Sequence, residues 1–252
     1  MKNSIILWIA AFVVVFLTGY FESVTNESYP VTGTFGISGE KVSYKFNKVH
    51  YGNKPFHFFI RSDAKDINGF LFWRKEQNQD WKKENLRWVN DELYADIPAQ
   101  KPETIIEYKA AVVYNNKTYR IPGDKIVFLK FIGEVPASIW GAFYFTLFAG
   151  LIIGVRTGLD YFNDKDKIRK LSLITVFFFF AYLLTIPLKT TFELGALNNR
   201  VPGFTELFSL QPVLLFINSF FVMIGLFNFK EKKITALIGA VIMISIFLFV
   251  RS

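Results

Sequence analysis

The sequence contains no cysteine and only two histidines. Without a thiol, the chain cannot use thiolate catalysis, disulfide bonds, cysteine-ligated zinc or iron–sulfur clusters. His50 and His57 are too few for a catalytic zinc site, which takes three protein ligands. The chain also lacks the Gly-x-Ser-x-Gly segment of α/β-hydrolases and the glycine-rich loops that bind nucleotide phosphates. We therefore expect no metal site and no cofactor.

The net charge of +8 has a local origin. The region 22–134 holds 17 Lys and Arg against 15 Asp and Glu, whereas the rest of the chain holds 12 against 6. The excess therefore flanks the apolar runs, where basic residues orient a membrane protein and need not bind phosphate. We expect no nucleic-acid partner.

Long apolar runs lie at both ends of the chain. Residues 136–155 carry no charge, and about twenty residues at roughly 1.5 Å each cross the core of a bilayer. We predict a transmembrane domain at 135–252 with four spans, at about 136–155, 171–188, 212–229 and 234–250. The run at 1–21 lacks the small residues of a cleavage site, which favours a retained anchor helix. A cleaved signal peptide is the alternative.

The region 22–134 has another pattern, in which short runs of β-branched and aromatic residues alternate with Gly, Asn, Asp and Pro. This pattern predicts an extracytoplasmic β-sandwich. Asn115 and Asn116 are expected to form a tight hairpin turn, because Asn tolerates positive φ. The predicted strands are 31–36, 41–46, 55–61, 68–75, 85–89, 92–97, 104–114, 117–121 and 125–131.

Two neighbouring runs carry a resemblance to a known fold class. They are LFWRKEQNQDWKKENLRW and LYADIPAQKPETIIEYKAAVVYNNKTYRIP. A strand ending near Trp73 and Arg74 leads through a polar hairpin to a second aromatic strand, and a segment from Tyr94 to Pro98 then precedes a long strand carrying Tyr108. This order is similar to immunoglobulin-like or fibronectin type III-like modules of bacterial envelope proteins. The resemblance implies a sandwich and brings no catalytic residue with it.

Flanking charge predicts the orientation. On one side we expect nine basic residues, Lys2, Arg156, Lys165, Lys167, Arg169, Lys170, Lys230, Lys232 and Lys233. Apart from the β domain, the other side has Lys189, Arg200 and Arg251. We expect a multi-pass protein of the bacterial cytoplasmic membrane, with a cytoplasmic N terminus and the β domain outside.

Small and polar residues in the predicted spans have two interpretations. Gly150, Gly154 and Gly158 recur every four residues, as does Gly141 after Ala137, and such spacing lets helices approach closely. The packing is either within the chain or with a partner. Asn218 either forms a helix-to-helix hydrogen bond or lines a substrate path. No ionisable residue lies deep in a predicted span, which argues against a proton-coupled pump.

Two groups of residues outside the spans are candidate binding residues. Trp73, Trp81 and Trp88 surround one polar hairpin and either fill the core or stack on a sugar or an apolar partner. The 189–211 loop brings four charged residues close to the membrane, and it is either a pocket wall or a solvated connector. These residues are Lys189, Glu193, Arg200 and Glu206.

Taken together, these features predict a non-enzymatic membrane protein. Its β-sandwich would bind a protein or envelope partner, and its helices would anchor it in a membrane complex. A small transporter or channel component that uses Asn218 is one alternative. A membrane-bound enzyme with Glu193 or Glu206 as acid or base is another. Few residues separate the last strand from the first span of the membrane domain, so we also expect the β domain to have little freedom to swing.

Overall fold

The structure is a computed structural model of the chain, and it describes residues 2–37, 39–64, 66–75, 77, 79–162, 167–196 and 202–250. Contacts divide the chain into two units. The helical unit comprises Met1–Asn26, Val135–Phe192 and Ala196–Ser252. The β unit comprises Glu27–Glu134 together with Glu193–Gly195.

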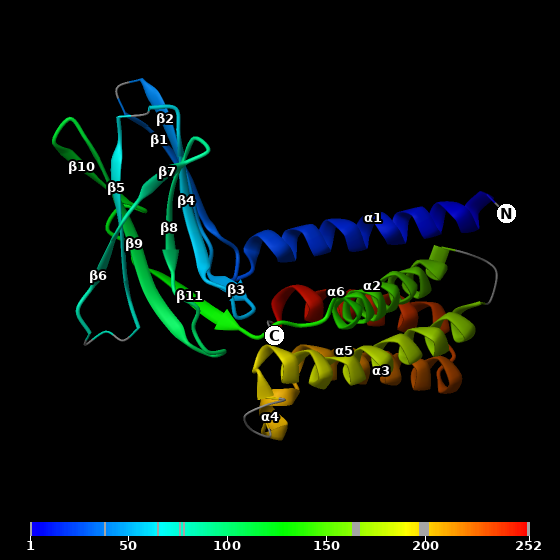
Figure 1. Ribbon diagram of the computed structural model, residues 1–252. Helices are drawn as coiled ribbons and strands as arrows, with labels where there is room; N and C mark the ends of the chain where they lie inside the picture. Colours follow the sequence, from blue (N-terminus) through cyan, green and yellow to red (C-terminus); the bar gives the residue numbers. More distant parts are fainter. Residues whose placement is uncertain are drawn as a thin grey trace. The chain divides into compact units, whose positions relative to one another are not determined.

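Over its described residues, the β unit contains two sheets (Figure 1). The first has the strand order β1-β2-β4-β8-β7, and the second has the order β3-β11-β9-β5-β6, with β10 paired to β9. The pairing of β11 with β3 is parallel. The strands are β1 (Val31–Ile37), β2 (Glu40–Phe46), β3 (Val49–Tyr51), β4 (Phe56–Ser62), β5 (Asn68–Arg74), β6 (Lys82–Asn85), β7 (Arg87–Val89), β8 (Glu92–Ile97), β9 (Ile105–Tyr114), β10 (Lys117–Ile121) and β11 (Val127–Ile132).

Alternation along the strands makes the core of the β unit. In β4 every second residue from Phe56 to Ser62 is buried, as expected for a strand with one face turned inward. The buried cluster draws Phe58 from the first sheet and Leu71 and Tyr108 from the second, so the two sheets pack face to face. The Tyr108 hydroxyl donates a 2.6 Å hydrogen bond to the Asn47 carbonyl, which satisfies the polar end of this buried ring.

The turns and strand bounds of the β unit agree in part with those predicted from the sequence. Asn115 and Asn116 have φ of 46° and 62°, and Lys117 pairs with Tyr114, so the predicted tight hairpin is confirmed. The predicted strand at 85–89 is instead divided between the two sheets, because the buried Leu86 lies between β6 and β7. The Leu86 N–H donates to the Gly69 carbonyl at 2.8 Å, which marks where the chain crosses. Strand β3 was not predicted.

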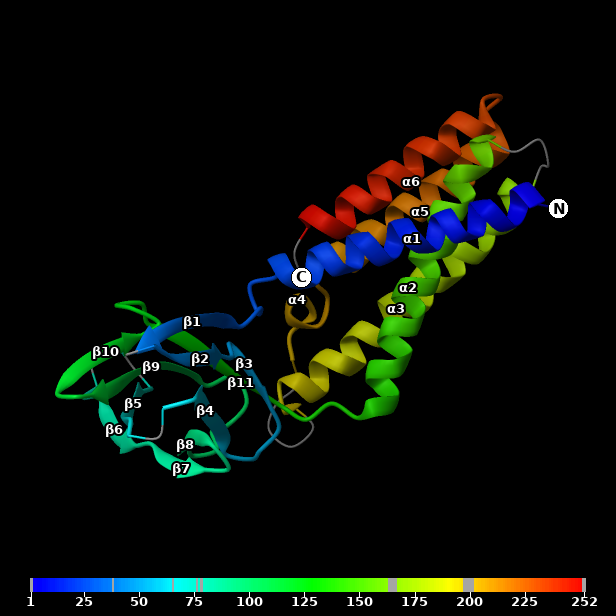
Figure 2. The same ribbon diagram turned by 90° about the horizontal axis from the view of Figure 1, so that it is seen from above.

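In the part of the chain that the structure describes, five helices are long and apolar enough to cross a membrane. These helices are α1 (Lys2–Thr25), α2 (Ala137–Leu159), α3 (Ile168–Glu193), α5 (Leu210–Asn228) and α6 (Lys232–Phe249). A 3₁₀ turn at Asp160–Phe162 follows α2, and α4 (Phe204–Leu207) is a single turn. Helix α2 packs against α1 and α6, and α5 packs against α6 (Figure 2).

Helix α2 continues four residues beyond the predicted end of its span at Val155. Arg156 is therefore helical and only 1% exposed, and its Nη1 lies 2.6 Å from Oδ1 of Asp160, which is fully buried. The guanidinium also lies over the Trp8 ring, with Cζ 5.6 Å from the ring centroid. Two opposite charges four residues apart are neighbours on a helix, so this ion pair lets both side chains be buried at the end of α2.

The α2 glycines divide into two classes. A Cβ at Gly150 would lie 3.0 Å from the Phe179 ring, at Gly154 2.5 Å from the Met243 sulfur, and at Gly158 2.4 Å from the Ala240 Cβ. These three contact α3 or α6 within the chain. A Cβ at Gly141 would have no described heavy atom within 4 Å. Close intramolecular packing therefore uses three of the four predicted glycines.

Candidate functional site

The three tryptophans lie in different environments. Trp73 is on β5 and 3% exposed, inside the core of the β unit. The Trp81 ring lies 4.5 Å from the Arg74 guanidinium and 4.3 Å from the Lys109 ammonium, measured to the ring centroid. Trp88 is on β7 in the other sheet, and its Nε1 donates to the Ile67 carbonyl at 3.1 Å. The structure thus does not bring the three together as one stacking surface.

Cations already lie against Trp81. Arg74 is fixed there because its Nε and Nη2 lie 2.7 and 2.6 Å from one oxygen of Glu107, whose side chain is 7% exposed. A guanidinium held by a partly buried carboxylate gives up little freedom when it packs on an aromatic face. Trp81 is thus part of a cation–aromatic cluster on the second sheet.

The stretch predicted as the 189–211 loop is partly helical, since Lys189 and Glu193 lie in the last turns of α3 and Glu206 lies in α4. The Lys189 ammonium lies 4.9 Å from the Trp140 ring centroid. The Glu193 carbonyl accepts a 2.6 Å hydrogen bond from the Gly133 N–H within the β unit. Glu206 accepts a 3.1 Å hydrogen bond from the Gly203 N–H and caps α4. Arg200 lies outside the described residues.

A polar strip runs along the outward face of β4 and β8. The pairs across it are His57 with Asp96, Phe59 with Tyr94, and Arg61 with Glu92. The His57 Nδ1 lies 2.5 Å from the Asp96 Oδ1, and the Tyr94 hydroxyl donates to the same carboxylate. Desolvation raises the pKa of Tyr94 from 10.0 to about 12, and the hydrogen bond and negative charge of Asp96 add to this rise.

The β unit has an open groove with a volume of about 570 Å³. Lys48, Lys125 and Lys130 line it, together with the carboxylate-bearing Glu27. The groove also has exposed apolar side chains, with Ile105 50%, Ile126 39% and Phe128 53% exposed. This volume is within the range of ligand pockets, about 300–1,000 Å³. The groove can therefore hold a group that is both anionic and apolar.

Little in the amino-acid sequence indicated this groove. Its wall combines the chain after α1 near Val31, the β2–β3 connection, the start of β9 and the segment from Pro122 to Lys130. The available signal was the alternation in KIVFLK, which places Ile126 and Phe128 on one side of a strand and Val127 and Leu129 on the other. The groove forms only where segments that are distant in the sequence lie side by side, and the sequence alone does not show that arrangement.

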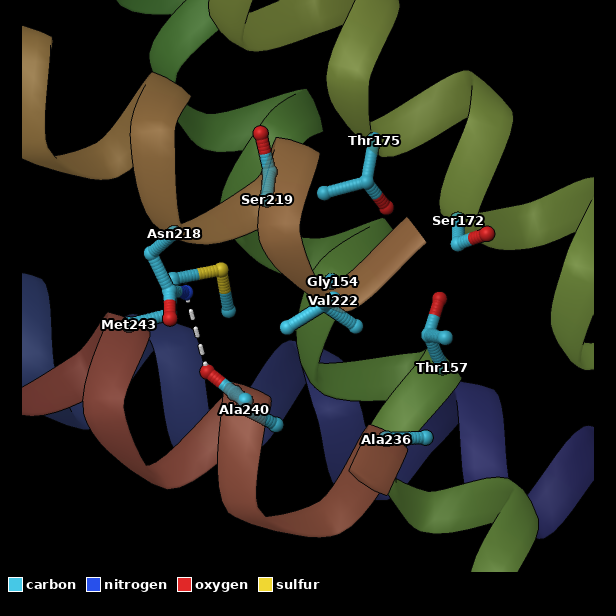
Figure 3. A pocket seen from close by; sticks show the side chains of 11 residues that line it. Gly154, Thr157, Ser172, Thr175, Asn218, Ser219, Val222, Ala236, Ala240 and Met243 are labelled. Atoms are coloured by element: carbon cyan, nitrogen blue, oxygen red, sulfur yellow. Dashed lines mark hydrogen bonds between the residues drawn. The ribbon is translucent and has the colours of Figure 1, made fainter. Parts of the chain in front are cut away.

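A second cavity lies inside the helical unit, and Figure 3 shows its lining. Its volume is about 20 Å³. Asn218 on α5 borders it, and its Nδ2 donates a 3.1 Å hydrogen bond to the Gly239 carbonyl on α6. Four hydroxyl side chains also line the cavity, from α2, α3 and α5, and they are Thr157, Ser172, Thr175 and Ser219. Asn218 thus joins two helices and lines a cavity as well.

Among the residues that the structure describes, no three His, Asp or Glu side chains gather as metal ligands. No family model matches the chain, and no curated protein matches it. Among solved structures, the chain is similar to the Br derivative of BhCBM56, with 12% sequence identity over 42% of this chain and 95% of that chain. The TM-score is 0.24, and a likeness at that score carries no argument.

Proposed function

We propose that the chain is a non-enzymatic membrane protein whose β unit binds a partner and whose helices anchor it in a membrane complex. The groove lined by Lys48, Lys125 and Lys130 is the observation that carries this proposal. Exposed aromatic and aliphatic side chains beside positive charge are typical of recognition surfaces. Lysines and exposed apolar side chains predominate in the lining, and this supports binding of a partner.

The partner we favour is a protein segment that carries both carboxylate and apolar side chains. Three lysines against one carboxylate favour an anionic group, and such complementarity increases the association rate as well as specificity. Ile105, Ile126 and Phe128 add apolar surface that a purely polar envelope polymer would leave uncovered. A protein segment uses both features of the groove.

The test is crosslinking in native membranes followed by mass spectrometry, with a photoreactive amino acid in place of Phe128. We expect one protein to be captured, and the double charge reversal Lys125→Glu and Lys130→Glu to reduce the capture at least tenfold. Lys117→Glu is the control, because Lys117 is exposed on β10 and does not line the groove. Capture that is unaffected by the double reversal, or capture of a glycan polymer alone, would overturn the assignment.

The fold class of the β unit is part of the proposal. The two face-to-face sheets and the hairpins of the β unit are compatible with an immunoglobulin-like or fibronectin type III-like sandwich. An assignment to either class also has to include the parallel pairing of β11 with β3. An experimental structure compared strand by strand with these modules would test the assignment, and a different strand order would refute it.

We also propose that the N terminus is cytoplasmic and the β unit extracytoplasmic, in the cytoplasmic membrane of a bacterium. The support is the charge bias around the apolar helices. Because the chain has no cysteine, single cysteines give labelling without background. We expect an impermeant maleimide to label Asn115→Cys in intact cells, and Lys230→Cys only after permeabilisation. The reverse pattern would refute the orientation.

The transporter alternative has one supporting feature, the cavity beside Asn218. Its volume of about 20 Å³ is only enough for a water-sized occupant. A solute path would have to open by a change of helix packing, and reconstituted protein that moved a solute would favour this alternative. The enzyme alternative would need Glu193 or Glu206 at a reacting centre, and Glu206 instead caps α4.

A further inference from the structure

The cavity inside the helical unit is lined by several polar side chains as well as by apolar and small residues. The four hydroxyl side chains that line it are each no more than 5% exposed. In Figure 3 the oxygens of Thr157, Ser172 and Thr175 lie on one side of the cavity, whereas Asn218 and Met243 lie on the other. Small residues make the rest of the wall, and they include Gly154, Ala236 and Ala240. Polar groups at a cavity of this kind favour an occupant that hydrogen-bonds to them.

The hydroxyl hydrogens are already used within their own helices. Each hydroxyl donates to a backbone carbonyl three or four residues earlier, at 2.7 to 2.9 Å. These pairs are Thr157 with Ile153, Ser172 with Arg169, Thr175 with Leu171, and Ser219 with Phe216. A hydroxyl oxygen has two acceptor lone pairs besides its donor, and the Asn218 carbonyl oxygen is also an acceptor. The lining therefore offers mainly acceptors and fits an occupant that donates.

Either a water molecule or a small cation could satisfy acceptors of this kind. The lining contains no carboxylate, and transferring an unpaired charge from water into an apolar interior is very costly. Sodium sites in helical membrane proteins commonly use carbonyls of unwound helix segments. Here α5 and α6 are continuous where they border the cavity. A neutral donor therefore fits better than a cation.

We propose that the cavity binds one ordered water molecule that links α2 and α3. The volume of about 20 Å³ exceeds the roughly 10–15 Å³ that one water requires. The water donates to the hydroxyl oxygens of Thr157 on α2 and Thr175 on α3, which face one another in Figure 3. This binding site is separate from the groove of the β unit and does not depend on the function proposed for it.

A double-mutant cycle between α2 and α3 tests the proposal in the full-length protein. Thr157→Val and Thr175→Val each keep the side-chain shape and remove one hydroxyl that accepts from the water. We expect each change to increase the unfolding equilibrium constant in mild detergent by about three- to tenfold. The double variant should show less than the product of the two, because both changes release the same water.

Thr146→Val is the matched control. Thr146 is buried on α2, but its hydroxyl donates only to the Ala142 and Phe143 carbonyls and does not line the cavity. The effect of Thr146→Val on the unfolding equilibrium constant should multiply independently with that of Thr175→Val. Multiplicative behaviour of the Thr157 and Thr175 pair would overturn the proposal.

Direct observation provides a second measurement that does not depend on the variants. An experimental structure that resolves ordered solvent should show one water within hydrogen-bond distance of the lining oxygens. An empty cavity would overturn the proposal. Replacing choline chloride with sodium chloride at equal ionic strength should leave the unfolding temperature unchanged. A stabilisation that increases with sodium concentration would identify a cation as the occupant and would also overturn the proposal.

Discussion

Gly158→Ala should weaken the packing of α2 on α6, whereas Gly141→Ala should not. The new Cβ at position 158 would lie 2.4 Å from the Ala240 Cβ and 3.2 Å from the Ala236 carbonyl oxygen. Neither atom belongs to a flexible side chain, so it cannot move alone. Ordinary contact begins near 3.4 Å, and the two helices must separate locally by about 1 Å.

The change in the free energy of unfolding is the sum of two opposing contributions. Overpacking a well-packed interior costs about 1–3 kcal/mol, and rigid neighbours favour the upper part of that range. Replacing Gly by Ala in a helix stabilises by roughly 0.5–1 kcal/mol. The net effect at Gly158 is a destabilisation of about 1–2 kcal/mol. At Gly141, where a Cβ would contact no described atom within 4 Å, only the stabilising term remains.

The assay is unfolding of the full-length protein from a mild detergent into dodecyl sulfate, followed by helical circular dichroism. The two variants carry the same substitution on the same helix, so they differ only in what surrounds the new methyl group. We expect their free energies of unfolding to differ by about 2–3 kcal/mol. Equal effects of the two substitutions would refute the packing described for α2 and α6.

Two further predictions concern the β unit. Asp96→Asn should lower the pKa of Tyr94 from about 12 towards 10.0, because two of its three causes involve Asp96; ultraviolet titration against a Tyr94→Phe reference measures it. The raised pKa stabilises the fold below pH 10, and this contribution is lost as pH rises through about 12. Tyr108→Phe should destabilise the β unit by about 1 kcal/mol, since it removes the hydrogen bond that Tyr108 donates to the Asn47 carbonyl, and protease resistance of that unit should decrease. An unchanged Tyr94 titration or unchanged protease resistance would contradict them.

Local patterns predicted most of the secondary structure. Alternation predicted β4 and β8, because a strand with one buried face has a period of two. Charge-free length predicted the long apolar helices. The burial of Arg156 was not predicted, because it depends on the ion pair with Asp160 and on the helices that surround the pair.

The candidate sites were harder to predict because they depend on distant pairings. The spacing of Trp73, Trp81 and Trp88 left open whether they fill the core or form one aromatic surface, and the crossing at Leu86 places Trp88 in the other sheet. Asn218 was recognised as a polar group that needs a partner, and its partner on α6 is 21 residues away. The period of one helix does not show which residue of a second helix lies opposite. For the same reason the hydroxyls of Thr157, Ser172 and Thr175 could not be assigned to a cavity.

The short segment Glu193–Gly195, which belongs to the β unit, has a consequence for biosynthesis. The strands of the β unit end at Ile132, yet Gly133 donates its N–H to Glu193, a residue that the ribosome adds only after α2 and most of α3. At about 5–20 residues per second, the interval from Ile132 to Gly195 is roughly 3–13 s. During that time the β unit has all its strands but not this last contact. A nascent chain arrested before Glu193 should therefore expose Gly133 to hydrogen exchange that the finished protein suppresses.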